Sequence, residues 1–137
     1  MEIKESIQIE AKPEDIFAVY KDVENWTSWD KHVISASLNG DFKVGTKGKI
    51  QPIKGPEVKI KITKLEENRL FVTEATPPLA KISFEHILTP IEDNLTEVTH
   101  KVKFSGISGG VFANMLGDKI KKSLPTVLKN LKQKLES

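Results

Sequence analysis

Apolar and polar residues alternate along much of the chain. Val58, Ile60 and Ile62, for example, are separated by single lysines. A period of two is typical of a β-strand with one dry and one wet face. Clusters rich in Gly, Pro, Asn and Asp punctuate the alternating segments and indicate turns. The pattern predicts seven strands, over residues 3–10, 33–38, 47–52, 57–65, 69–75, 80–89 and 95–104.

The period changes after residue 109. Apolar residues then recur at steps of three and four, with lysines on the other faces, which predicts an amphipathic helix from Gly109 to about Leu135. Such a helix is about 40 Å long, enough to cross a whole sheet. Pro125 lies inside it, lacks a backbone N–H and should bend it. Its apolar positions are Phe112, Met115, Leu116, Ile120, Leu124, Val127, Leu128, Leu131 and Leu135.

Two shorter helical segments are predicted between the first two strands. Pro13 suits the first position of a helix, and the acids that follow suit its first turn. Residues 22–30 form a second helical segment in which Trp26 and Trp29 share one face. Because short connections favour antiparallel neighbours, the predicted fold is α+β: a curved, seven-stranded antiparallel sheet wrapped on a long C-terminal helix.

Composition and charge limit the classes of function. The 137 residues suit one domain, over residues 1–137, and the absence of cysteine excludes disulfides and thiol nucleophiles. The 21 basic and 19 acidic residues include a single arginine, Arg69, so we expect no nucleic-acid partner. No apolar run approaches the roughly 18–20 residues that span a bilayer, so we expect no stable membrane insertion. With no signal-like segment at Met1, we expect a cytoplasmic protein.

The order of these elements resembles the START-like, birch-pollen-allergen-like helix-grip superfamily (SRPBCC), and in particular its polyketide cyclase/dehydrase-type branch. Three motifs carry the resemblance. They are IQIEAKPEDIF at residues 7–17, DVENWTSWD at residues 22–30, and TEVTH followed by FSG at residues 96–106, before a Gly-rich entry to the last helix. The resemblance implies a cavity between the sheet and the first part of that helix, which holds a lipid, polyketide or quinone-like molecule.

The implied cavity has one wall on the helix and one on the sheet. Core packing alone is the alternative interpretation of each of these side chains, although Met115 would adapt well to varied ligands. Trp29 is a core residue that could also reach the cavity mouth. The implied wall residues are Phe112, Met115, Leu116 and Ile120, with Ile60, Phe84 and Phe104 opposite.

Two histidines are the candidate chemical groups. Strand alternation turns His86 and His100 inward on neighbouring strands, where they could hydrogen-bond a ligand carbonyl or hydroxyl, or act as a general base. Alternatively, each is a buried histidine satisfied by protein groups. A metal site would need a third ligand, for which Glu74 is the nearest candidate, but the pattern does not determine which face Glu74 occupies, so we expect no metal. His32 is expected at the surface or rim. The glycines near residue 109 lack the phosphate-loop and dinucleotide spacings, so we expect no cofactor.

Three functions therefore remain open. The first is a binder or carrier of a small hydrophobic or amphipathic molecule, without catalysis. The second is a cyclase or dehydratase in which His86 or His100 moves a proton. The third is a protein-interaction module with a filled cavity, which would bind an unknown partner through the outer face of the sheet.

Overall fold

A computed structural model describes residues 1–137 and contains the seven predicted strands and the three helical segments. The strands are β1 (Glu2–Ile9), β2 (Val33–Leu38), β3 (Lys47–Pro52), β4 (Val58–Glu66), β5 (Leu70–Ala75), β6 (Lys81–Glu92) and β7 (Leu95–Ser105). The helices are α1 (Pro13–Lys21), the 3₁₀ helix η1 (Val23–Ser28) and α2 (Gly109–Glu136). The prediction of an α+β helix-grip fold is confirmed.

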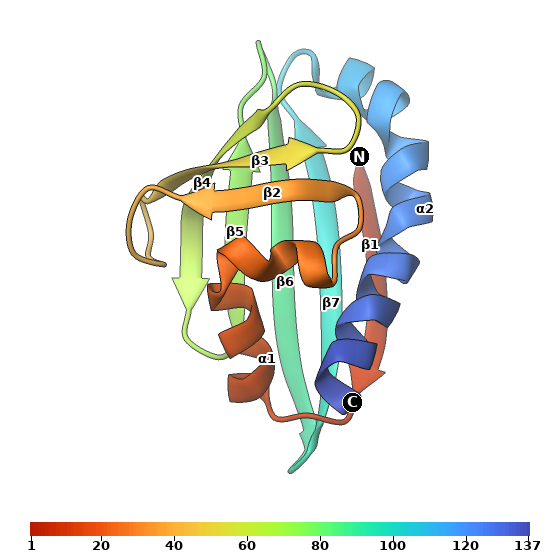
Figure 1. Ribbon diagram of the computed structural model, residues 1–137. Coiled ribbons are helices and arrows are strands. Elements are labelled where there is room, and N and C mark those ends of the chain that lie inside the picture. Colours follow the sequence, from red (N-terminus) through yellow and green to blue (C-terminus); the bar gives the residue numbers. More distant parts are fainter.

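All neighbouring strands are antiparallel, in the order β1-β7-β6-β5-β4-β3-β2. The sheet is so strongly curved that β2 and β3 cross in front of β5, β6 and β7 (Figure 1). Strand β6 extends beyond its predicted end because Pro90 is accommodated beside a register shift, between Pro90 and Glu92. A bulge at this point lets a residue without a backbone N–H remain in the strand.

Helix α2 runs alongside β1 and β7 (Figure 1). The small residues Ala113 and Gly117 allow α2 to approach the sheet closely, and both are buried. Pro125 lies inside the helix, as predicted, and its ring is on the exposed side. The helix remains one continuous element from Gly109 to Glu136.

The corner between β7 and α2 depends on one glycine. Gly106 has a φ of +90°, and a Cβ on it would lie 2.7 Å from the carbonyl oxygen of Leu79. Both the backbone conformation and the lack of space therefore require glycine. The backbone N–H of Ser108 donates to the same carbonyl at 2.9 Å, which holds the β5–β6 loop against the start of α2.

The buried apolar side chains form two separate clusters. The first cluster joins α1, η1 and the second half of α2 to the sheet, with Phe17, Phe71 and Leu131 near its centre. The second cluster is smaller and joins the first half of α2 to β1, β6 and β7, through residues such as Ala113 and Phe104. The candidate site lies where the two clusters meet.

Candidate functional site

The inward face of β6 and β7 changes from apolar to polar and back along its length. Four cross-strand pairs form it: Ile82 with Phe104, Phe84 with Val102, His86 with His100, and Leu88 with Val98. The first pair belongs to the second cluster and the last pair to the first cluster. The two histidines therefore lie directly opposite each other, at the junction of two apolar regions.

The first half of α2 leaves apolar side chains incompletely covered. Phe84 of β6 and three residues of α2 pack against the second cluster but remain partly accessible. We call these four the accessible apolar set: Phe84, Phe112, Leu116 and Ile120. In the second half of the same helix, Val127, Leu128 and Leu131 are buried. The two halves of α2 thus differ. Most large apolar side chains of the second half are buried, with Leu135 at the helix end partly accessible, whereas Phe112, Leu116 and Ile120 of the first half are all partly accessible.

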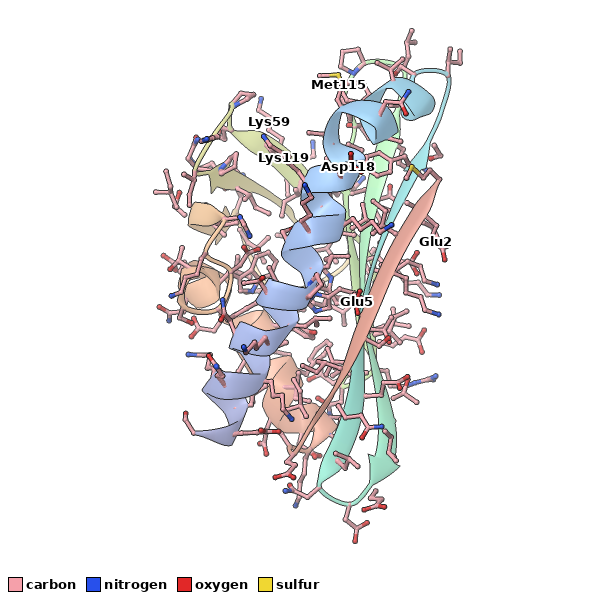
Figure 2. All side chains as sticks on the ribbon, turned by 90° about the vertical axis from the view of Figure 1, so that its right-hand side faces the viewer. Glu2, Glu5, Lys59, Met115, Asp118 and Lys119 are labelled. Atoms are coloured by element: carbon pink, nitrogen blue, oxygen red, sulfur yellow. The ribbon has the colours of Figure 1, made fainter.

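Two of the expected wall residues are buried, and a third lies at the surface of α2. Ile60 and Phe104 are buried on the inward face. Met115 is 67% exposed and lies on the side of α2 turned away from β1 (Figure 2). At about 100° per residue, Met115 is roughly 160° around the helix from the buried Ala113. Met115 therefore lies at the surface of the ligand-free protein, and its contact with a ligand stays a prediction.

His100 is the more deeply buried histidine, with 4% of its surface exposed. Its Nε2 lies 2.7 Å from the hydroxyl of Tyr20, which is completely buried in α1. Burial holds the pKa of His100 well below 6.5, and the neighbouring His86 lowers this pKa further. Burial also raises the pKa of Tyr20. Both groups are therefore neutral at pH 7, and the phenol can donate to the imidazole.

His86 is held by Phe71 but keeps part of its surface accessible. Its ring is stacked on that of Phe71, with centroids 4.0 Å apart, and its Nδ1 lies 3.4 Å from the carbonyl oxygen of Phe71. Burial lowers the pKa of His86 to about 4, although the backbone carbonyls of Phe71 and Phe84 act in the opposite direction. The ring meets that of His100 edge-on, at 4.7 Å between centroids. We call Tyr20, His86 and His100 the polar band.

Both tryptophans border the polar band. Trp26 donates from Nε1 to the carbonyl oxygen of Tyr20 at 2.8 Å. Trp29 is 3% exposed. The centroid of its ring lies 5.9 Å from the ring centroid of Tyr20 and 6.2 Å from that of His100. Its Nε1 is the one buried side-chain N or O atom without a hydrogen-bond partner. The indole ring of Trp29 thus packs against two members of the polar band, Tyr20 and His100.

Tyr20 and Phe71 were not among the predicted site residues. Tyr20 follows Ile16 at a spacing of four on α1, which indicates a buried helix face but not its partner. Phe71 pairs directly with His86 across β5 and β6. Strand alternation places the two side chains on one face, so a correct register would have identified Phe71.

Two further polar side chains, those of His32 and Glu5, lie outside the polar band. His32 is exposed, as expected, after η1. Glu5 pairs with His100 across β1 and β7, yet its side chain is exposed at the edge of the sheet, beside α2 (Figure 2). No group of three or more His, Cys, Asp or Glu residues is placed to hold a metal ion.

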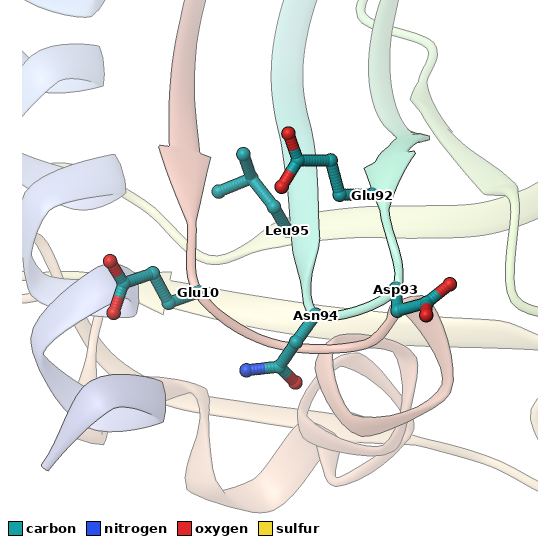
Figure 3. A pocket seen from close by; sticks show the side chains of 5 residues that line it. All are labelled: Glu10, Glu92, Asp93, Asn94 and Leu95. Carbon is teal, nitrogen blue, oxygen red and sulfur yellow. The ribbon is translucent and has the colours of Figure 1, made fainter.

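Two hollows in the surface lie away from this face. One of about 580 Å³ lies at the β6–β7 turn, where acidic and amide side chains surround a single leucine (Figure 3). Its lining residues are Glu10, Glu92, Asp93, Asn94 and Leu95. Another of about 300 Å³ lies over β3 and β4 and includes Lys49 and Glu57. No helix in this structure combines the length and the apolar character that crossing a membrane requires.

Solved structures share this fold at low sequence identity. The Zhui aromatase/cyclase from Streptomyces sp. R1128 is 12% identical, with a TM-score of 0.80 over 99% of this chain and 93% of that chain. Norcoclaurine synthase from Thalictrum flavum, in complex with dopamine and hydroxybenzaldehyde, is 14% identical, with a TM-score of 0.74 over 97% and 84%. A START superfamily protein from Mycobacterium smegmatis is 14% identical, with a TM-score of 0.72 over 98% and 97%.

Sequence comparison leads to the family. No curated protein matches the chain significantly. The model of one family, described as polyketide cyclase/dehydrase and lipid transport, matches residues 1–136. Together with the curved seven-stranded sheet and the long C-terminal helix, this match shows that the chain belongs to the polyketide cyclase/dehydrase and lipid-transport family of START-like helix-grip proteins.

Proposed function

We propose that this protein binds a small hydrophobic or amphipathic molecule between the first half of α2 and the sheet. The observation that carries the proposal is the accessible apolar set. Phe84, Phe112, Leu116 and Ile120 pack against the second cluster but remain partly accessible, while Val127, Leu128 and Leu131 in the second half of α2 are buried. A guest that covers these side chains would complete the second cluster.

The expected driving force is the burial of apolar surface. Each Å² removed from water stabilises the complex by about 25 cal/mol, so about 200 Å² of guest and wall contributes about 5 kcal/mol before the cost of association. Apolar pockets with few polar groups suit guests of this kind. Membership of a family whose description includes lipid transport supports the proposal.

Catalysis of a cyclase or dehydratase type is a second candidate, favoured by the hydrogen bond between Tyr20 and His100. A general base works best when its pKa is near the working pH. The pKa of about 4 makes His86 a weak base at pH 7, and His100 is shifted in the same direction. The polar band is therefore better suited to orienting a guest than to removing its proton.

Titration with the neutral apolar dye N-phenyl-1-naphthylamine tests the binding proposal. Wild-type protein should enhance the dye's fluorescence saturably, and Leu116→Trp should weaken dye binding at least tenfold, because the larger ring fills the space beside Phe112. The matched control is Lys122→Trp on the exposed face of α2, which should leave the affinity within twofold of wild type.

Two results would contradict the proposal. One is an absence of saturable dye binding by the folded wild-type protein. The other is an equal loss of affinity in both tryptophan variants, because a dye on the outer surface would not distinguish Leu116 from Lys122. Circular dichroism of each variant establishes that it is folded.

A further inference from the structure

The polar band has hydrogen-bonding capacity that the protein itself does not use. Nε2 of His86 and Nδ1 of His100 have no hydrogen-bond partner in the protein. Neither atom is sealed, because Trp29 Nε1 is the only fully buried side-chain N or O atom without a partner. Two imidazole nitrogens thus keep some accessible surface at the level of the sheet where the two apolar clusters meet.

The contact with Phe71 assigns the tautomer of His86, and the direction of the Tyr20 hydrogen bond sets that of His100. A neutral imidazole carries one N–H, so Nδ1 of His86 donates to the carbonyl of Phe71, and Nε2 is left as an acceptor. The hydroxyl of Tyr20 has Nε2 of His100 as its partner. If this hydroxyl donates, Nδ1 of His100 carries the proton. The band then offers the interior one acceptor and one donor.

The aromatic rings that pack around these nitrogens are uncharged. The rings around them are those of Tyr20, Trp26, Trp29 and Phe71. Glu5, the cross-strand partner of His100, is acidic. An anion brought here would lose its hydration without gaining a counter-ion, which is strongly unfavourable. A neutral hydroxyl can donate to one nitrogen and accept from the other.

We propose that the guest is an uncharged hydroxylated lipophile, such as an aromatic or aliphatic alcohol, whose hydroxyl bridges His86 Nε2 and His100 Nδ1 while its apolar body covers the accessible apolar set. The inference rests on the proposed function and adds to it a selection against carboxylates. Phe84 is the residue before His86 on the inward face of β6. The apolar body of a guest can therefore contact Phe84 while the hydroxyl of the same guest contacts His86.

Three probes of one shape test the inference at pH 7.5 by displacement of N-phenyl-1-naphthylamine: naphthalene, 2-naphthol and 2-naphthoate. We expect 2-naphthol to bind at least tenfold more tightly than 2-naphthoate and at least fivefold more tightly than naphthalene. His86→Leu should remove the advantage of 2-naphthol over naphthalene while leaving the naphthalene affinity within twofold. If this variant does not fold, the comparison of the three probes on the wild-type protein still tests the inference.

The outcomes separate the two proposals. If 2-naphthoate binds as tightly as 2-naphthol, or if naphthalene equals 2-naphthol in the wild type, the inference is overturned and the binding function stands. If none of the three probes displaces the dye and the dye does not bind, the proposed function fails as well. In a complex with 2-naphthol, the imidazole ¹⁵N resonances of His86 and His100 should shift, and unchanged resonances would also overturn the inference.

Discussion

Leu131→Ala should lower the free energy of unfolding by about 2–5 kcal/mol, and Leu116→Ala by clearly less, under about 1.5 kcal/mol. Both leucines lie on α2, so the helix propensity of the replacement is the same at both positions. Leu131 is 0% exposed in the first cluster, whereas Leu116 is partly accessible. Removing a side chain from a sealed core leaves a cavity, and removing one beside open space does not.

Urea denaturation of the ligand-free protein, followed by circular dichroism, measures both changes. The control is Lys122→Ala, which should remain within about 0.5 kcal/mol of wild type because its side chain is exposed. Equal large losses at Leu116 and Leu131 would mean that the first half of α2 is as tightly packed as the second, and there would be no accessible face for a guest to cover.

Acidification should destabilise the protein between pH 6.5 and about pH 4 through the polar band. The folded-state pKa of His86 is about 4, against an ordinary value of 6.5. Below pH 6.5 the unfolded chain therefore binds a proton that the folded chain does not, and stability falls as the pH falls until the folded form also takes up the proton. For His86 the loss is up to about 3 kcal/mol, and His100 adds to it in the same direction.

The test compares wild type with His86→Leu by urea denaturation at several pH values between 7 and 4. Carboxylates contribute equally to both proteins, including Asp30, whose pKa is raised by burial, so the difference between the two curves reports the histidine. The wild type should lose stability more steeply than the variant. Parallel curves would show that the imidazole of His86 is not desolvated in the folded protein.

The sequence predicted the elements well because the periods are clear in this chain. The alternation of Val58, Ile60 and Ile62 identifies a strand, and the steps of three and four identify α2. The inward direction of His86 and His100 followed from the same alternation. Their direct opposition did not, because a register depends on the β6–β7 turn and on the shift beside Pro90.

The polar band could be predicted only in part. Tyr20 reaches His100 because α1 packs across the concave face of the sheet, and that placement depends on long-range packing with Phe71 and Trp29. Met115 shows a second limit of sequence-based prediction, which concerns the side of a helix that an apolar residue occupies. Its apolar character suggested the inner wall, but rotation of the helix turns it outward, and composition alone does not determine which side of an apolar stripe is covered.

Native mass spectrometry of the folded chain tests the central claim most directly. Protein of 15.3 kDa would be purified without detergent and measured before and after incubation with 2-naphthol or N-phenyl-1-naphthylamine. We expect a one-to-one complex with a neutral lipophile, which Leu116→Trp abolishes and Lys122→Trp retains. A spectrum that shows only the bare chain under all of these conditions would contradict a binding site between α2 and the sheet.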